Sequence, residues 1–450
     1  MAKSKQKFIC QNCEAVFYKW AGRCESCGEW NSLVEQTLPE VGRSAVARSI
    51  NNGKPLQVNS LNSIPFEEGM KRLKTGIGDL DIILGGGILP GGVTLLAGQP
   101  GIGKSTLLLQ TVANIAHNYD VLYISGEESA GQVRLRAARL GADKSSNLNF
   151  AASTSADDIA ATIRTGKYQL VVVDSVQTLH LNEITSSPGS VSQITSSSNV
   201  IINAAKETGT SVIFVGHVTK EGSIAGPKIL EHLVDVVLQF EGDRYGGFKI
   251  VRAVKNRYGS TNEAAIFEMG EKGLRIVENP SAALLAERRD EDGSVVLATL
   301  EGARPLLVEI QALVNSTNFG YPKRTASGFD INRLNLLIAV LERRTKLKLS
   351  DKDIYINVVG GIKISDPAAD LAICMAIASA SAGRRLNYGT VVFGEVGLGG
   401  EVRSVISIEK RIAEAKKLGF TKALAPITIK DDFIIGVDNV RSTLIEYLQK

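Results

Sequence analysis

Residues 98–105 read Gly98-Gln-Pro-Gly-Ile-Gly-Lys-Ser105, which fits the pattern Gly-x4-Gly-Lys-Ser/Thr. The apolar run Val93–Ala97 precedes this loop, and the apolar helical pattern Thr106–Ala116 follows it. A glycine-rich turn between a buried strand and a helix lets backbone N–H groups close around a phosphate at the helix N-terminus. The stretch therefore predicts a nucleoside triphosphate site, and its flanking elements argue against a chance glycine-rich turn.

The same motif gives individual residues their expected contacts. Lys104 should reach the β- and γ-phosphates of ATP, and Ser105 should ligate Mg²⁺. The residues expected to bind ATP and Mg²⁺ are Gly98, Gln99, Pro100, Gly101, Ile102, Gly103, Lys104, Ser105 and Thr106.

Hydrolysis also needs a second carboxylate at the magnesium ion and a group that orients the attacking water. The apolar run Leu170–Val173 ends in Asp174, which supplies the carboxylate. Glu127 and Glu128 follow the strand pattern Val121–Ser125, and either could act on the water. We favour Glu127, the other acid then being an ordinary helix-start residue. A domain that only binds nucleotide does not need this glutamate, so its presence favours an ATP hydrolase.

The regions around the loop indicate the domain organisation. From residue 61 to residue 280, apolar strand runs alternate with helical patterns, which is typical of a parallel sheet buried on both faces. We therefore predict an α/β core over 61–280. Residues 35–60 are polar and lack periodicity, as expected for a linker, and a second mixed region spans 281–450.

Residues 1–34 hold four of the five cysteines, arranged as Cys10-x2-Cys13 and Cys24-x2-Cys27. Zinc takes four thiolates in a tetrahedron, and each Cys-x2-Cys turn offers two. The alternatives are a pair of disulfides, which a cytosolic compartment disfavours, and four unrelated thiols. We therefore predict a Zn²⁺-binding module that depends on its metal to fold.

Basic and aromatic side chains alternate around these cysteines at Lys19, Trp20, Arg23 and Trp30. This mixture suits contact with nucleic acid or with a partner protein. Alternatively, the two tryptophans simply cover the metal site.

Composition sets further limits on the protein class. With 44% apolar and 22% charged residues, the 450-residue chain is neither disordered nor collagen-like as a whole. The net charge of +4 is too small to indicate general nucleic-acid binding, so any DNA contact must be local. No apolar segment follows the basic residues of Met1–Lys7, so we expect no secretory signal. The most apolar stretch, residues 368–382, is too short to span a bilayer and is predicted to be a buried helix. We therefore expect a cytoplasmic protein without a membrane partner.

Several motifs carry a family resemblance. Thr75-Gly-Ile-Gly-Asp-Leu-Asp81, Gly85-Gly-Gly87, the phosphate loop and Ser125-Gly-Glu-Glu-Ser129 resemble the RecA/KaiC-type ATPase core. With the four-cysteine module and Lys255-Asn-Arg-Tyr-Gly259, the chain resembles the bacterial RadA (Sms) family of DNA repair proteins over essentially its whole length. Tyr258 stands where that family usually has phenylalanine.

The resemblance implies a homo-oligomeric ring, expected to be a hexamer, with DNA-dependent ATPase activity. Such a motor would translocate on single-stranded DNA and, with the RecA recombinase, promote branch migration at branched recombination intermediates. The alternative is a KaiC-like regulatory ATPase that controls a protein assembly without moving along DNA.

The resemblance also implies roles for particular residues. Lys255 and Arg257 would reach the ATP of the neighbouring subunit and stabilise γ-phosphate charge there; a solvated basic turn is the alternative. His217 would sense the γ-phosphate, or it is a structural histidine. Two segments, 181–198 and 219–228, match DNA-binding loops, with Lys220 and Lys228 as phosphate contacts, and ordinary surface loops as the alternative.

Residues 281–450 resemble the α+β proteolytic domain of Lon protease. The matching stretches are Arg304–Gln311, Asp353–Asn357 and Gly394–Leu398. Lon uses a Ser–Lys pair, but here the serine motif is replaced by Asp366-Pro-Ala-Ala-Asp370. The lysine position aligns with Glu409, although Lys410 is adjacent. Because the methyl group of Ala368 cannot attack a carbonyl, we expect no peptidase activity.

Basic residues also gather between positions 321 and 348. They are Lys323, Arg324, Arg333, Arg343, Arg344, Lys346 and Lys348, against Asp330 and Glu342. A local charge of +5 along a helical pattern predicts a DNA-binding surface, with Lys323, Arg324, Arg343 and Arg344 as contacts. A solvated helix face is the alternative.

Overall fold

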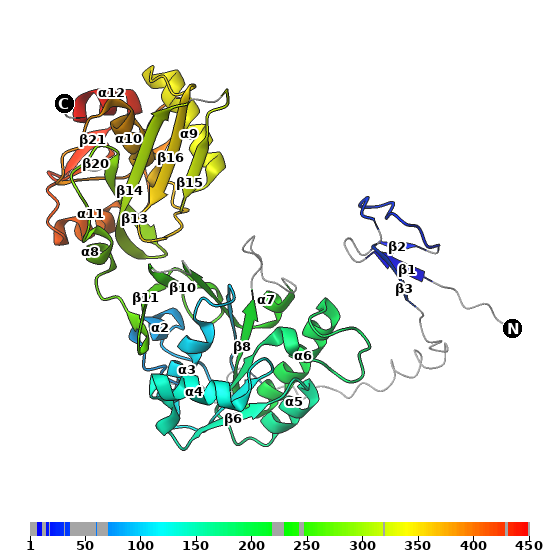
Figure 1. The fold of residues 1–450 in the computed structure, drawn as a ribbon. Helices are drawn as coiled ribbons and strands as arrows, with labels where there is room; N and C mark the ends of the chain where they lie inside the picture. The colour runs from blue at the N-terminus through cyan, green and yellow to red at the C-terminus, as the bar shows by residue number, and fades with distance from the viewer. Residues whose placement is uncertain are drawn as a thin grey trace. The chain divides into compact units, whose positions relative to one another are not determined.

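The computed structural model describes residues 7–10, 15–17, 19–30, 32–36, 60, 71–217, 229–242, 247–317, 320–427 and 431–448. These residues belong to two compact units, Met1–Glu68 and Gly69–Lys450 (Figure 1). Among the described residues, no helix combines the length and the apolar character needed to cross a bilayer.

The first unit contains an antiparallel sheet in the order β2-β1-β3. Its strands are β1 (Lys7–Cys10), β2 (Val16–Phe17) and β3 (Leu33–Gln36). The described core of this unit consists of Phe8, Cys10, Cys24 and Leu33. So little apolar surface cannot offset the entropy lost on ordering the segment, so a bound metal would have to supply much of the folding free energy.

The larger sheet of the second unit has the strand order β12-β11-β10-β9-β4-β8-β7-β5-β6. The strands are β4 (Val93–Gly98), β5 (Val121–Ser125), β6 (Leu148–Ala152), β7 (Leu170–Asp174), β8 (Ser211–His217), β9 (Val236–Gly242), β10 (Lys249–Asn256), β11 (Ala264–Gly270) and β12 (Gly273–Ile276). From β9 to β6 in the sheet order, neighbouring strands run parallel, whereas β10, β11 and β12 pair antiparallel.

Helices cover both faces of this sheet (Figure 1). On one face lie α2 (Gly78–Ile83), α3 (Lys104–Ile115) and α4 (Ala130–Leu140), and on the other α5 (Ala156–Arg164), α6 (Val191–Thr208) and α7 (Ile229–Leu233). Every residue of β4, β5 and β7 is buried as a result. The prediction of a parallel α/β core from continuous apolar strands is confirmed.

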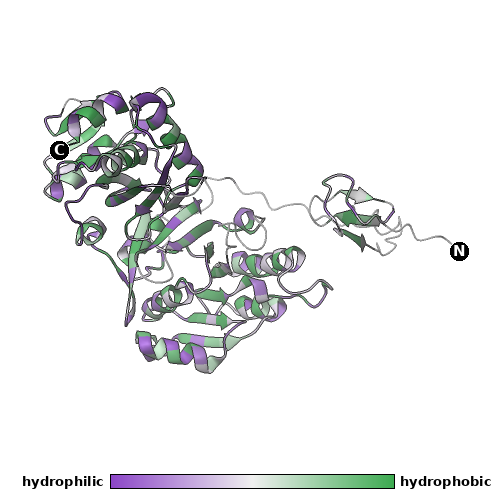
Figure 2. Cartoon of the chain, turned by 45° about the horizontal axis from the view of Figure 1, so that its top comes forward, coloured by the Kyte–Doolittle hydropathy of each residue, from purple (hydrophilic) through white to green (hydrophobic). Residues whose placement is uncertain are grey.

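A second, mixed sheet has the strand order β15-β16-β14-β13-β17-β20-β21. Its strands are β13 (Ser294–Glu301), β14 (Arg304–Ser316), β15 (Arg324–Ser327), β16 (Lys352–Val358), β17 (Thr390–Val392), β20 (Lys422–Pro426) and β21 (Ile434–Val437). The strands β18 (Glu395–Val396) and β19 (Val402–Arg403) form a separate hairpin. In Figure 2 the strands of both large sheets are mostly hydrophobic.

The helices of this region are α8 (Pro280–Leu285), α9 (Ile331–Thr345), α10 (Ala369–Ala382), α11 (Ile408–Lys417) and α12 (Val440–Tyr447). Helix α10 packs against β13, β14, α9 and α12 and is buried along most of its length, which confirms the expected buried helix. The predicted boundary at residue 280 falls at the start of α8. It stays a prediction, because Gly69–Lys450 is one compact unit.

A buried ion pair joins α11 to the segment before α10. The Arg411 side chain is fully buried, and its guanidinium lies 2.8 Å from Asp366 Oδ2 and donates to the carbonyl oxygen of Ala298 at 2.7 Å. Asp366 also accepts hydrogen bonds from Thr299 Oγ1 and the Leu300 N–H. Since a buried guanidinium is costly without its counterion, this contact constrains how the C-terminal region folds.

We expect Asp366→Asn to lower the free energy of unfolding by about 3–5 kcal/mol, because Arg411 would stay buried without a counterion. Adding Arg411→Met to that variant should recover part of the loss, since both members of the pair would then be neutral. Urea unfolding of the single and double variants measures both effects. A loss below about 1 kcal/mol for Asp366→Asn would contradict the expectation.

Candidate active site and zinc site

The carboxyl ends of four neighbouring strands, β4, β8, β7 and β5, form one edge of the larger sheet. Parallel strands bring the residues that follow them to a common edge, where ligands bind in open α/β sheets. The phosphate loop follows β4, His217 ends β8, Asp174 ends β7, and Glu127 and Glu128 come just after β5.

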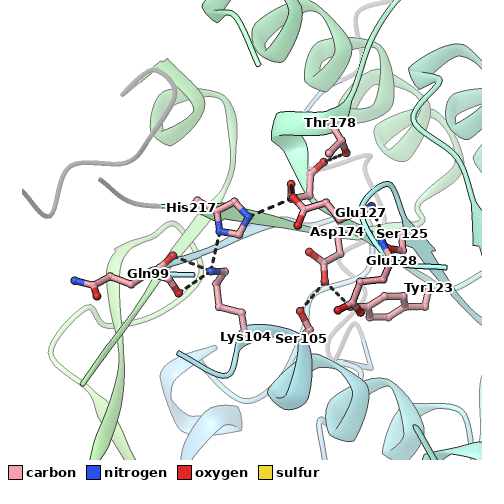
Figure 3. Close-up of polar contacts among 12 residues, drawn as sticks. Gln99, Lys104, Ser105, Tyr123, Ser125, Glu127, Glu128, Asp174, Thr178 and His217 are labelled. Carbon is pink, nitrogen blue, oxygen red and sulfur yellow. Dashed lines mark hydrogen bonds and ion pairs between the residues drawn. The ribbon is translucent and has the colours of Figure 1, made fainter. Parts of the chain in front are cut away.

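A cavity of about 380 Å³ lies along this edge, and Figure 3 shows how the polar side chains around it point toward one another. Its lining residues are Pro100, Gly101, Gly103, Lys104, Ser105, Thr106, Ser125, Glu127, Glu128, Arg136, Arg139, Asp174 and His217. Of the expected ATP contacts, Gly98, Gln99 and Ile102 do not line it, and Ile102 is buried in the core instead.

The loop backbone suits a phosphate. Gly101 and Gly103 have φ angles of 79° and 120°, a region that residues with a β-carbon rarely adopt. Helix α3 begins immediately afterwards, and no side chain caps its first turn. The first backbone N–H groups of α3 are therefore available to donate hydrogen bonds to phosphate oxygens.

Lys104 is buried at the base of this cavity. Its ammonium donates hydrogen bonds to the carbonyl oxygens of Gly98 at 2.7 Å and Gln99 at 3.1 Å, and lies 3.1 Å from His217 Nδ1 (Figure 3). Burial lowers the pKa of Lys104 from 10.5 to about 8, although Asp174 and Glu127 act in the opposite direction. A bound polyphosphate would favour the charged ammonium at this position.

Asp174 is oriented by two hydroxyl groups. Its Oδ2 atom accepts hydrogen bonds from Ser105 Oγ at 2.8 Å and from the buried Tyr123 hydroxyl at 2.6 Å. Burial, and then the Asp174 carboxylate, raise the pKa of Tyr123 well above its usual value, so this hydroxyl stays a donor. The pairing fixes the Asp174 carboxylate beside the first residues of α3.

The two candidate glutamates have different surroundings. Glu128 forms a two-pronged ion pair with Arg136, with N–O distances of 2.6 and 2.7 Å. Glu127 accepts a hydrogen bond from Ser175 Oγ, and its Oε1 atom lies 3.3 Å from His217 Nε2 (Figure 3). Glu128 is thus engaged by an arginine, whereas Glu127 faces the histidine that also contacts Lys104.

Lys255 and Arg257 lie at the opposite edge of the sheet. The Arg257 guanidinium is 3.1 Å from Asp235 Oδ1, and Asp235 Oδ2 accepts the N–H of Val93, the first residue of β4. Five residue steps along β4 separate Val93 from Gly98, a span of about 17 Å. Neither cation lines the cavity, and Arg257 is too far away to reach a nucleotide bound by its own phosphate loop.

Lys255 is tied to the end of α7. Its ammonium donates to the carbonyl oxygens of Glu231 at 2.6 Å and Val234 at 2.8 Å, with a longer contact to that of His232. Partial burial and the nearby Arg257 lower the pKa of Lys255. The described contacts of Lys255 and Arg257 therefore all lie at the edge of the sheet opposite the cavity.

The residues expected to contact DNA are only partly accessible in the described regions. Lys220 and Lys228 lie outside the described residues. Arg324 donates to the carbonyl oxygens of Lys352 and Leu349. Arg343 and Arg344 are exposed in the last turn of α9, and Lys323 is exposed before β15.

The +5 estimate for residues 321–348 overstates the free charge of this region. Arg333 forms an ion pair with Asp370, a residue outside the stretch from which the charge was counted. The amphipathic pattern of α9 did not reveal this long-range partner.

Three of the four predicted zinc ligands are described, and they lie together. The Sγ atoms of Cys10, Cys24 and Cys27 are all within 4.8 Å of one another, and those of Cys10 and Cys27 are 3.6 Å apart. A disulfide requires about 2 Å, whereas thiolates around a tetrahedral zinc ion lie about 3.8 Å apart. The donor set and spacing therefore fit Zn²⁺; Cys13 lies outside the described residues.

Comparisons with known proteins agree with this division of the chain. Family models match at residues 8–35 (rubredoxin metal binding domain), 69–223 (AAA domain) and 334–429 (subunit ChlI of Mg-chelatase). A DNA repair protein RadA from Bacillus subtilis is 48% identical over 99% of both chains. The chain belongs to the RadA family of DNA repair proteins. RadA proteins of Pseudomonas aeruginosa and Aquifex aeolicus are 46% and 44% identical, covering 95% and 100% of this chain and 94% and 99% of their own lengths.

Membership in the RadA family confirms the resemblance seen in the sequence motifs. The AAA match covers the phosphate loop and its neighbouring strands, so the chain is an ATPase with an ATP-binding core. The metal-binding match coincides with the cysteine cluster, which identifies a zinc-binding module. The ChlI match runs from α9 to β20 and agrees with the predicted Lon-protease-like α+β region.

Sequence reasoning missed several residues of the site. Tyr123 lies within the strand pattern Val121–Ser125, which predicted a strand and gave no sign of a contact with Asp174. Arg136 and Arg139 line the cavity from α4, and their spacing of three residues on the helix after Glu128 was a usable signal. Ser175 gave no such signal, since its contact with Glu127 depends on two strands meeting.

We expect the stability difference between the protein and a Lys104→Met variant to depend on pH. Between pH 8 and pH 10.5 the folded protein releases a proton from Lys104 that the unfolded chain still holds, so the free energy of unfolding rises in this window. The variant should lack this rise, which we expect to be about 1–3 kcal/mol. Urea unfolding at both ends of the window measures it, and parallel pH profiles would contradict the pKa of Lys104.

Proposed function

We propose that this RadA family member is a DNA-dependent ATPase of recombinational repair. It would assemble into a homo-oligomeric ring, most simply a hexamer, and translocate on single-stranded DNA to drive branch migration together with RecA. The observation that carries the proposal is the position of His217, which contacts both Lys104 and Glu127 and ends β8 directly before the segment expected to bind DNA. DNA contact and ATP chemistry would be linked through this one side chain.

The contacts of each polar group in the cavity suggest which part of ATP hydrolysis it would perform. Lys104 and the first N–H groups of α3 would hold the β- and γ-phosphates. Ser105 and Asp174, which are hydrogen-bonded to each other, would hold Mg²⁺, and the ion would supply charge neutralisation when bound. Glu127 would orient the attacking water; we prefer it to Glu128 because Arg136 already occupies both oxygens of Glu128.

Lys255 and Arg257 would complete the site of the neighbouring subunit. The length of β4 separates Arg257 from the phosphate loop of its own chain, which supports a role in trans. The exposed Arg257 guanidinium, held by Asp235, is suited to stabilise the charge that develops on the γ-phosphate across an interface. This arrangement makes hydrolysis depend on ring assembly.

We propose that the Lon-protease-like region acts as a scaffold and not as a peptidase. Ala368, which replaces the serine, is completely buried at the N-terminal end of α10. Asp366 in the same motif is used by Arg411, and Glu409 stands at the lysine position. The exposed cations Lys323, Arg343 and Arg344 would offer local phosphate contacts to DNA.

We expect single-stranded DNA to stimulate ATP hydrolysis, and Lys104→Ala to reduce the stimulated rate by at least about 100-fold, because a positioned cation at the transferring phosphate is lost. Steady-state hydrolysis with and without DNA measures this. Arg134→Ala is the matched control, since Arg134 is an exposed cation of α4 that does not line the cavity. Absence of stimulation, together with absence of salt-sensitive DNA binding, would overturn the motor and favour a KaiC-like regulatory ATPase.

We expect a mixture of Arg257→Ala and Lys104→Ala subunits to recover hydrolysis that neither variant shows alone. In an equimolar ring, about a quarter of the interfaces would combine an intact phosphate loop with an intact neighbouring arginine. The recovered rate should therefore approach a quarter of the wild-type rate. Light scattering checks that rings persist, and intact mixed rings without recovery would contradict action in trans.

A further inference from the structure

The zinc module presents two exposed tryptophans. Trp20 and Trp30 have 60% and 68% of their surface accessible. A residue that only covers a metal site is expected to be largely buried, so these exposures argue for a further role of the two side chains. Exposing two large aromatic rings carries a cost in water, and at the surface such rings are typical of a site that stacks on a ligand.

The two indoles meet at one glycine. A methyl group placed on Gly22 would lie 3.9 Å from both Trp20 Cη2 and Trp30 Cζ3, so the edges of both rings approach the same point of the backbone. The Arg23 guanidinium lies over the Trp30 ring, 5.8 Å from its centroid. Arg23 Nε also donates to the Gly28 carbonyl oxygen at 2.7 Å, which holds the guanidinium in that position. The rings and the cation therefore form a preorganised group.

We propose that Trp20 and Trp30, with Arg23, form a stacking site for bases of single-stranded nucleic acid; the inference rests on the proposed function in that it presumes contact with DNA. Indole rings stack on any base, so binding would tolerate sequence changes. The guanidinium beside Trp30 would reach a backbone phosphate or extend the stack. This site would add to, and be separate from, the contacts expected in the ATPase core.

The charges around the tryptophans favour stacking over electrostatic attraction. In the described stretch 19–30, Lys19 and Arg23 are balanced by Glu25 and Glu29, all of them exposed. A charge-neutral surface gains little from counterion release, so this contact should depend weakly on salt. A protein-docking surface typically has an apolar centre around its aromatic anchors, whereas these rings have charged neighbours in the chain at Lys19 and Glu29.

Intrinsic tryptophan fluorescence can test this site directly. Trp20 and Trp30 are its only tryptophans, so the intrinsic tryptophan fluorescence of the full-length protein reports on them alone. Titration with oligo-dT should quench this fluorescence, with the same midpoint that the anisotropy of a labelled oligo-dT gives for binding. Polyphosphate, a polyanion without bases, should leave the fluorescence unchanged.

Substitution of each tryptophan tests whether oligo-dT binds at this site. Trp20→Ala and Trp30→Ala should each weaken oligo-dT binding by about 5- to 100-fold, as expected for the loss of one stacked base. Tyr388→Ala is the matched control, because Tyr388 is a half-exposed aromatic ring that also carries an arginine over its face, Arg288 at 4.2 Å. Its binding should stay at the wild-type level. Zinc content equal to that of the wild type verifies that each tryptophan variant keeps its folded module.

The outcomes separate this proposal from the proposed function. Binding seen by anisotropy without a change in tryptophan fluorescence would overturn the stacking site and leave the DNA-dependent ATPase standing. A lack of binding in both measurements would overturn both. Fluorescence that responds to a recombinase protein and not to oligo-dT would overturn the nucleic-acid site and identify the surface as a protein contact.

Discussion

The parallel pairing of β4, β8, β7 and β5 is the constraint on which the active site depends. Each strand positions only the residues that follow it. The pairing of the four strands brings these residues, which come from four separate sequence motifs, to one edge of the sheet. Backbone hydrogen bonds along fully buried strands set the height of each residue to within a fraction of a residue step. Ser105 Oγ and Asp174 Oδ2 can therefore lie 2.8 Å apart although the two residues are 69 positions apart in the sequence.

The same strand pairing brings several charged side chains together in a partly buried site. Lys104, Asp174 and Glu127 share a partly enclosed cavity, and burial disfavours every isolated charge there. The contacts of the site are therefore mutual: Tyr123 and Ser105 hold Asp174, and His217 joins Lys104 to Glu127. A site made of mutually dependent polar contacts responds as a whole when a highly charged ligand enters it.

Much of this arrangement could be predicted from the sequence because it depends on local patterns. The phosphate loop, the acid that ends β7 and the apolar runs of the sheet are short motifs whose physics acts over a few residues. Contacts between distant segments could not be predicted in this way. Arg324 and Arg333 were both counted as surface charge. Arg324, however, donates to carbonyl oxygens of the first residue of β16 and of the loop before it, and Arg333 binds Asp370 at the start of α10. The hydrogen bond from the Tyr123 hydroxyl to Asp174 likewise depends on the pairing of β5 with β7, which no local pattern reveals.

The burial of Ala368 has a consequence for how this region can change during evolution. Ala368 is enclosed in the core, and its neighbour Asp366 is committed to the fully buried Arg411. A hydroxyl introduced at this position would be enclosed in the core, out of reach of a substrate. Opening the position to solvent would disturb the segment that holds the Arg411–Asp366 ion pair, at a cost in stability. The packing around Ala368 therefore restricts which substitutions this segment tolerates, whereas exposed positions of the sheet and helices can vary more freely.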